Sequence, residues 1–511
     1  MKARSPRRPA VALLLLALLA TACTVGAPPP AGRPAAPSTA ASSGRAAAPS
    51  AVASASAAAS ASPAPQALQT QLLGKLALTP AHGPWGTQVT AAATGLVPQT
   101  KYNLVWTTVT GGWELSADRS EYKGRKYAPV QTPLSSVTTD GAGAFSASFS
   151  VPQGFGFQHD VLVLEGATVL RNQAGFDVDL QIEISPKSGP VGTPITIEAR
   201  GIGWRQLENS WLLSYDNDFT GWLSSVTTAG AARAVVPATG SPGVHVLTIL
   251  HGDFTFPYLN MQQSPSPNRP QFRIPFMVTE GPAVLPAKVE QQVLPRLAAK
   301  PIERGIWAAP ASGLVGERAS LAGRALPANS DVSLVWTTME GNRVANGYDE
   351  VTKPLGTART DGAGAFSWDF AVPNDLGGAH KVTAKVGDQV VGQTAFTLQP
   401  NAFALPKDHG PSGTEVAVHL FGVGWTETAN IYHLVYDNSY VGYACGFNSG
   451  GDVTVNFVMS GEKGWHYLDL YPGIYKGVET RPLNFRVPQL TFADDHPGEV
   501  LPAFHYAFLI D

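Results

Sequence analysis

Cysteine and charge are both scarce in this chain of 511 residues. Only Cys23 and Cys445 occur, and Asp, Glu, Lys and Arg together make up 14% of the residues. The formal net charge is −3, and four of the 35 basic residues lie within the first eight positions. A mildly acidic protein without a basic stripe is a poor binder of nucleic acid, and we expect no nucleic-acid partner.

Motifs that carry catalysis or bind metals are also missing. The chain has no Gly-x-Ser-x-Gly, no phosphate-cradling Gly-Lys-Ser/Thr and no His-Glu-x-x-His. Asp216-Asn217-Asp218 resembles part of a calcium loop, but it lacks the glycine and the distal Glu, and Ser439 replaces Asp218 in a second copy. The sequence therefore predicts a non-enzymatic protein with no cofactor and no metal site.

The N-terminus reads as an export signal. Lys2, Arg4, Arg7 and Arg8 precede an apolar run, and Ala20-Thr21-Ala22-Cys23 resembles a bacterial lipobox, with Cys23 as the lipidated residue. The alternative is simple secretion with cleavage near Ala22. The following Ala/Ser/Pro-rich stretch to residue 70 contains almost no large apolar side chain, which predicts a disordered tether. With Cys23 lipidated, Cys445 would be the one remaining thiol, and we expect it to be a small, packed residue.

The rest of the chain is a duplicated pair of modules. Gly189 to Trp204 recurs as Gly410 to Trp425, an offset of 221 residues, and a related turn phrase opens at Gly83 and Gly313. Gly supplies positive φ in this phrase, Pro restricts the next residue, and Thr begins a strand. The short alternating runs that follow have the period of two expected of half-buried strands.

These repeats predict an all-β protein of four tandem immunoglobulin-like β-sandwiches in the order A1-B1-A2-B2. Trp106 and Trp336 occupy matching Leu-Val-Trp-Thr-Thr strands and are expected in the A cores. The predicted parts are a signal peptide (1–22), the tether (23–70), A1 (71–178), B1 (179–280), a Pro-rich spacer (281–302), A2 (303–399), B2 (400–490) and a C-terminal tail (491–511).

Three segments outside the common pattern carry their own expectations. The A1 insertion between Trp113 and Ser135 reads as a longer, solvated hairpin. Residues 287–294 of the spacer could form one short helix bounded by prolines. The tail is expected to dock on a neighbouring module, with Asp494 and Asp495 solvated.

The openings GPVGTPITIEARGIGW and GPSGTEVAVHLFGVGW resemble those of the immunoglobulin-like, plexin, transcription-factor (IPT/TIG) domains. B1 and B2 fit this pattern best, and A2 fits worst because Gly316-Glu317 replaces Gly-Thr. The resemblance implies an immunoglobulin-like sandwich. In bacterial surface proteins it implies a stalk, a spacer or a binding module.

One constellation is a candidate binding site, and it occurs twice. An aromatic ring beside Asp and Asn suits a sugar, because the ring stacks on the pyranose while the carboxylate and amide bond to hydroxyls. The alternative is structural, since Asp and Asn cap turns and the aromatics complete a core. The candidate residues are Tyr215, Asp216, Asn217, Trp222 and His245 in B1, and Tyr436, Asp437, Asn438, Tyr443 and His466 in B2.

Together these patterns predict an exported, lipid-anchored protein of the bacterial cell envelope, facing the periplasm or the exterior. Its expected work is surface binding or adhesion through the repeated B loops, with an envelope polysaccharide or a surface protein as partner. Two separate loops could engage a repetitive ligand together. The alternatives are a structural spacer or scaffold subunit, and an envelope hydrolase with carboxylates or histidines meeting in a cleft.

Overall fold

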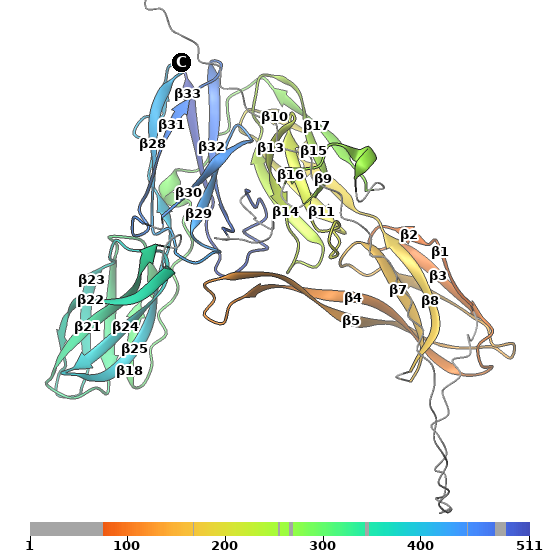
Figure 1. Ribbon diagram of the computed structural model, residues 1–511, viewed down its shortest axis with the longest axis horizontal. Coiled ribbons are helices and arrows are strands. Elements are labelled where there is room, and N and C mark those ends of the chain that lie inside the picture. Colours follow the sequence, from red (N-terminus) through yellow and green to blue (C-terminus); the bar gives the residue numbers. More distant parts are fainter. Residues whose placement is uncertain are drawn as a thin grey trace, which may run out of the picture. The chain divides into compact units, whose positions relative to one another are not determined.

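A computed structural model describes residues 75–166, 168–253, 256–264, 269–342, 347–446, 448–475 and 487–511. These residues form an all-β protein, and two short 3₁₀ turns are their only helical elements (Figure 1). Among them, no helix is long and apolar enough to cross a membrane. The predicted signal peptide, Cys23 and tether lie outside the described residues.

Each module is a sandwich of a three-stranded sheet and a larger sheet with five strands in the same order each time, to which B1 adds a short sixth strand. In each large sheet, a short strand near the start of the module pairs in parallel with the last strand of the module, as in immunoglobulin-like sandwiches. The four sandwiches confirm the predicted fold class.

In A1 the small sheet is β1 (Lys75–Thr79), β3 (Gln88–Thr94) and β6 (Phe145–Ser150), and the large sheet is β2 (His82–Gly83), β8 (Thr168–Val178), β7 (Phe157–Glu165), β4 (Lys101–Leu115) and β5 (Tyr122–Thr138). In B1 the small sheet is β9 (Gln181–Ser185), β11 (Pro194–Arg200) and β14 (Ala231–Pro237), and the large sheet is β10 (Ser188–Pro190), β17 (Phe272–Thr279), β15 (Gly243–Asp253), β12 (Trp211–Tyr215) and β13 (Asp218–Leu223), with β16 (Phe256–Pro257) beside β15.

In A2 the small sheet is β18 (Gly305–Ala309), β20 (Arg318–Arg324) and β23 (Phe366–Ala371), and the large sheet is β19 (Ser312–Gly313), β25 (Gln389–Leu398), β24 (Gly378–Val386), β21 (Asp331–Asn342) and β22 (Gly347–Arg359). In B2 the small sheet is β26 (Asn401–Ala402), β28 (Thr414–Phe421) and β31 (Val453–Met459), and the large sheet is β27 (His409–Gly410), β33 (Phe504–Ile510), β32 (Gly464–Gly473), β29 (Ile431–Tyr436) and β30 (Ser439–Cys445).

The cores follow from the alternation in the sequence. In β3 every second residue is buried, and the same holds for β11 and β28. Trp106 and Trp336 lie in the A1 and A2 cores, as expected, and are 2% and 1% exposed.

The repeated turn phrase has the predicted physical role. Its second glycine has φ of +82° at Gly192 and +93° at Gly413, a region that L side chains avoid. The threonine that follows donates its hydroxyl back to the turn proline, over 2.7 Å from Thr193 to Pro190. In A2 the carboxylate of Glu317 instead accepts the amide of Leu314 at 2.8 Å, so a different side chain closes the same turn.

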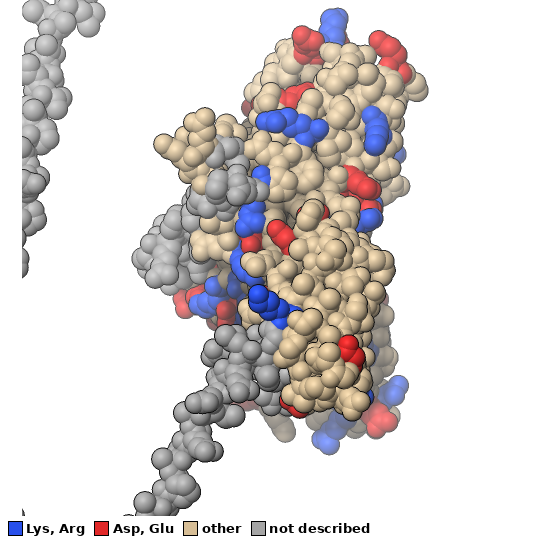
Figure 2. All heavy atoms as spheres, turned by 90° about the vertical axis from the view of Figure 1, so that its right-hand side faces the viewer, with Lys and Arg blue, Asp and Glu red and all other residues tan. Residues whose placement is uncertain are grey.

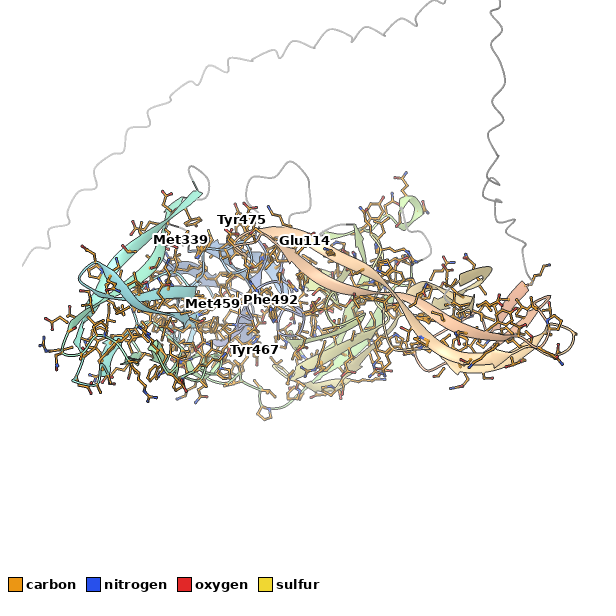
Figure 3. The ribbon with its side chains drawn as sticks, turned by 90° about the horizontal axis from the view of Figure 1, so that it is seen from below. Glu114, Met339, Met459, Tyr467, Tyr475 and Phe492 are labelled. Carbon is orange, nitrogen blue, oxygen red and sulfur yellow. The ribbon has the colours of Figure 1, made fainter. Side chains whose placement is uncertain are left out.

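The A1 insertion is a long hairpin of β4 and β5, which we call the A1 hairpin (101–138); residues 117–119 at its tip are exposed, but the strand residues next to the tip pack against other modules. Tyr122 is 3% exposed and joins Trp222 of B1 and Val487 of B2 in one apolar cluster. The indole Nε1 of Trp113 donates to Asp495 at 3.1 Å, and the amide of Tyr122 donates to Glu427 at 2.7 Å. The insertion therefore binds the B modules, which the polar residues around it did not indicate. Figure 3 labels Glu114 near the end of this hairpin and Phe492 in the segment that it meets.

The spacer and the tail also differ from expectation. The predicted helix over 287–294 is a single 3₁₀ turn, Val289–Gln291. The next residue, Gln292, instead exchanges side-chain hydrogen bonds with the backbone of His505, at 2.7 and 2.9 Å. Residues Phe504–Ile510 are not a docked tail but β33, which pairs with β32 along the middle of the B2 large sheet. Alternate residues of β33 are buried, and they complete the B2 core.

Candidate functional site

The Asp and His residues of the candidate site form the same pair in both B modules. His245 donates from Nδ1 to Asp216, and its Nε2 donates to the carbonyl of Ser241 at 2.8 Å. His466 donates from Nδ1 to Asp437 at 2.6 Å and from Nε2 to the carbonyl of Glu462 at 2.8 Å. This hydrogen bond to Asp437 raises the pKa of His466 above its ordinary value.

Each aspartate also holds the backbone of the next strand. The second carboxylate oxygen of Asp216 accepts the amide of Val246 at 2.8 Å, and that of Asp437 accepts the amide of Tyr467 at 2.9 Å. Asp216 and Asp437 have φ of +49° and +47°, which the two-residue turns between paired strands require. The pairs thus tie the β12–β13 and β29–β30 turns to the starts of β15 and β32.

The tyrosines complete each arrangement. Tyr215 stacks on His245 and Tyr436 on His466, with ring centroids 5.6 Å apart in both cases. Tyr215 donates its hydroxyl to the carbonyl of Thr239 at 2.9 Å, and burial raises the pKa of Tyr215 to about 12. Each tyrosine therefore stays a neutral donor that anchors the loop before the His-bearing strand.

Direct contacts between B1 and B2 bring the two copies together. Asn438 is fully buried and donates its side-chain amide to Pro237 at 2.8 Å and to Thr239 at 3.0 Å. Thr220 donates to the carbonyl of Asn438 at 2.6 Å. Asn438 is thus a structural residue of this interface, in line with the turn-forming alternative.

Between the two turns lies a cavity of about 610 Å³, which we call the B cleft. The start of the spacer, residues 281–283, also lines it, and next to these residues Tyr467 of β32 donates its hydroxyl to the carbonyl of Val284 at 2.9 Å. The polar and aromatic residues of its walls are Tyr215, Asp216, Asp218, Ser241 and Glu280 from B1, and Asp437, Glu462, Lys463, Trp465 and His466 from B2. The two copies predicted as separate contact points therefore face one cavity.

Not every candidate residue reaches the B cleft. The candidate residues that line it are Tyr215, Asp216, Asp437 and His466. Those that do not are His245, Asn217, Tyr436 and Asn438. Trp222 is 2% exposed and packs in the A1 hairpin cluster, so it is not an exposed stacking platform. Its counterpart Tyr443 is 43% exposed but lies on β30, away from the cleft.

The expectations that Cys445 is packed and that Asp495 is solvated are both wrong. Cys445 is exposed rather than packed, although its counterpart Ser224 is buried. Asp495 is 1% exposed, and its carboxylate accepts the amides of Val226 at 2.7 Å and Thr227 at 2.9 Å. Both outcomes depend on contacts between modules, which a linear pattern does not display.

Trp465, Asp218, Glu280, Glu462 and Lys463 are the cleft residues that the sequence did not single out as ligand contacts. A signal did exist for Trp465, which is half-buried beside His466 at the start of β32. Alternation places it on the same face as Tyr467, outside the B2 core, where the matching residue of B1 is the exposed Val244. Among the described residues, no group of His, Cys, Asp and Glu is arranged to hold a metal ion.

Comparisons with known proteins give no family for this chain. No family profile matches it, so the IPT/TIG resemblance stays a prediction, and no curated protein matches it either. Solved structures of low identity align over much of its length. One is Salmonella alpha-2-macroglobulin reacted with methylamine, at 11% identity and a TM-score of 0.18, covering 86% of this chain and 31% of that one.

Two further alignments are with an adhesion protein and a membrane-anchored protein. The tetra-tandem repeat in the extending region of a large adhesion protein aligns at 11% identity and a TM-score of 0.17, over 86% of this chain and 99% of that one. A putative membrane-anchored protein from Corynebacterium diphtheriae aligns at 13% identity and a TM-score of 0.18, over 64% and 91%. At such scores these proteins define no function for the chain, which spans under a third of the alpha-2-macroglobulin.

Proposed function

We propose that this protein is a non-catalytic binding protein of the bacterial cell surface, which holds an envelope polysaccharide in the B cleft. The observation that carries the proposal is the convergence of both duplicated turns and of Trp465 on one cavity of about 610 Å³. A cavity of this size accommodates a few sugar rings, and clefts between modules are common binding sites.

The chemistry of the walls suits a glycan. Trp465 offers an aromatic face against which a pyranose ring can stack. Asp218, Glu280 and Ser241 are exposed around it and offer oxygen acceptors and a hydroxyl to sugar hydroxyls. The Asp–His pairs hold both walls in place, so little ordering is needed when a ligand binds.

The same pairs argue against hydrolysis. Both ring nitrogens of each histidine are occupied, one by a carboxylate and the other by a backbone carbonyl, so neither is placed to take a proton from water. Each aspartate is likewise occupied by a histidine and a backbone amide. These groups serve as supports of the cleft in the proposed function.

We place the protein on the outer side of a membrane, held by a lipid on Cys23 and extended from it by the 24–70 tether. The support for this part is the basic and apolar N-terminal sequence and the lipobox-like Ala-Thr-Ala-Cys. Charged residues of both signs are interspersed with uncharged ones on the face shown in Figure 2. Such a surface suits a protein that works in an aqueous envelope compartment.

The test uses the chain from residue 24 onward, which retains the whole compact unit Gln69–Asp511. Binding to purified envelope and matrix polysaccharides is measured by calorimetry, beside a Trp465→Ala variant. We expect saturable binding that weakens about tenfold or more in the variant, because the stacking face is lost. Trp307→Ala, which removes a half-buried tryptophan of A2, serves as the control and should bind as the wild type does.

A scaffold role is the second candidate, and one observation favours it. The edge strand β30 of B2 exposes Val441 by 54% and Tyr443 by 43%. At the matching edge of B1, Trp222 of β13 exchanges backbone hydrogen bonds with Pro488 and Leu490 of B2, at 2.9 and 3.0 Å. An edge strand with exposed apolar residues is a surface for another protein. Absence of polysaccharide binding by the wild type would favour this role.

A further inference from the structure

The carboxylates of the B cleft differ in whether they have partners within the protein. Asp216 and Asp437 each bind a histidine and a backbone amide, so their charge is used within the protein. Asp218, Glu280 and Glu462 line the same cavity at exposed positions. In the described part of the chain these three carboxylates form no ion pair, and Lys463 is the one Lys or Arg in the lining.

The three carboxylates come from both walls. Asp218 begins β13 and Glu280 follows β17 in B1, whereas Glu462 precedes β32 in B2. A ligand between the walls therefore meets negative charge on either side. Carboxylates that face a shared cavity raise the local concentration of cations and favour a positively charged ligand.

The aromatic wall favours the same ligand. The indole of Trp is the best of the aromatic side chains for a cation, because its ring face carries negative electrostatic potential. Trp465 is half-buried and lines the cavity two residues from the loop that carries Lys463 and Glu462. A protonated amine on a sugar ring can contact the indole while its N–H groups donate to carboxylates.

We propose that the B cleft selects glycans that carry free, protonated amino groups, by carboxylates on both walls and the Trp465 ring on the B2 wall. This proposal deepens the polysaccharide-binding function and rests on it. A neutral or N-acetylated glycan can stack on Trp465 but gains nothing from Asp218, Glu280 and Glu462. The cavity thereby discriminates by charge as well as by shape.

Two probes with one backbone test this selection. The hexamer of β-1,4-linked glucosamine carries amino groups, and its fully N-acetylated counterpart carries none. Calorimetry with the chain from residue 24 onward should show binding of the amine hexamer about tenfold or more tighter, falling as salt is added because the contacts are ionic. The acetylated hexamer should bind weakly and with little dependence on salt.

Variants then locate the effect. The double variant Asp218→Asn, Glu280→Gln should lose most of the preference for the amine hexamer, whereas Trp465→Ala should weaken both probes. The matched control, Asp388→Asn with Glu415→Gln, removes two exposed carboxylates outside the cavity and should leave the preference unchanged. Circular dichroism checks that each variant retains the β fold.

The other possible results each contradict either the selection by charge or the polysaccharide-binding function as a whole. Equal or tighter binding of the acetylated hexamer, or an unchanged preference in the double variant, overturns the selection by charge. Binding of a neutral envelope polysaccharide without binding of the amine hexamer overturns the same proposal and leaves the polysaccharide function standing. Failure of every glycan to bind overturns both.

Discussion

The Asp–His pairs are the residues on which the geometry of the B cleft depends most directly. Each joins a tight turn to the start of a neighbouring strand, and each is covered by a stacked tyrosine. An exposed Asp and His would contribute little, because solvent screens their attraction. Here the His466 side chain is only 13% exposed, so its charge is held close to that of Asp437.

The raised pKa of His466 gives a prediction with a defined sign. A histidine whose pKa is raised in the folded state stabilises the protein fully below the unfolded value of about 6.5, and this contribution is lost as pH rises through the folded value. His466→Gln should therefore lower the melting temperature more at about pH 5.5 than at about pH 9. The loss in free energy of unfolding should differ between the two pH values by about 1 kcal/mol or less.

Thermal unfolding followed by circular dichroism at both pH values measures this difference. His82→Gln, a change at an exposed histidine of A1, is the comparison variant. If His466→Gln cost the same stability at both values, the ionised pair with Asp437 would have no part in holding the turn.

At the scale of elements, the A1 hairpin and the segment 487–495 form the least expected contact of the molecule. Asp495 accepts hydrogen bonds from Trp113 of the hairpin and from Val226 and Thr227 of B1, and Gln489 donates to Ser224 at 2.9 Å. Gly111 shows how closely the hairpin approaches B1, since a Cβ there would lie 2.0 Å from the carbonyl oxygen of Val226. One short segment of B2 thus holds two earlier modules.

Asp495→Ala should destabilise the protein by about 2 kcal/mol or more, because it leaves the buried amide of Val226 and the less buried donors of Trp113 and Thr227 without their acceptor. Denaturant unfolding measures the change. The matched control is Asp494→Ala, at the exposed neighbouring position, and its effect should stay within about 0.5 kcal/mol. Equal effects of the two substitutions would contradict the role assigned to Asp495.

The sequence was sufficient to predict structural features that depend on contacts within one module. It was not sufficient to predict those that depend on contacts between modules. Alternation and the Gly-Pro-x-Gly-Thr turns predict the sandwiches, because strand period and positive φ are local properties. The burial of Trp222, Asn438 and Asp495 depends on partners in other modules, at least 100 residues away in the sequence. Likewise, the ten candidate residues could be identified as a duplicated set, but not as two walls of one cavity.

At the scale of the whole molecule, the modules are joined by repeated and by unique contacts. The joint between A and B is the same in both halves: Gly156 donates its amide to Ile202 at 3.0 Å, and Gly377 donates to Val423 at 3.1 Å. The A1 hairpin has no full counterpart, since β21 and β22 have 12 and 13 residues against 15 and 17 in β4 and β5. Among the described residues of the two A modules, those that contact the segment 487–495 of B2 belong to the A1 hairpin.

Shortening this hairpin should change how the whole chain unfolds. Replacing residues 113–125 by the four residues 343–346 gives A1 a hairpin of the A2 length and removes the contacts of Trp113 and Tyr122. We expect scanning calorimetry to show A1 unfolding as a separate transition at lower temperature than the rest, because contacts between modules couple their unfolding. The same calorimetric profile in the wild type and the shortened variant would show that the hairpin does not couple the unfolding of A1 to that of the other modules.

The contacts of the A1 hairpin join residues far apart in the sequence, which matters while the chain is being synthesised. Tyr122 and Glu427 are 305 residues apart in sequence, and Trp113 and Asp495 are 382 apart. A ribosome delivers the hairpin long before either partner, so Trp113 and Tyr122 lack these partners while three more modules are made, a period in which exposed apolar side chains can aggregate. The first module to emerge cannot complete its contacts until the last module has been made.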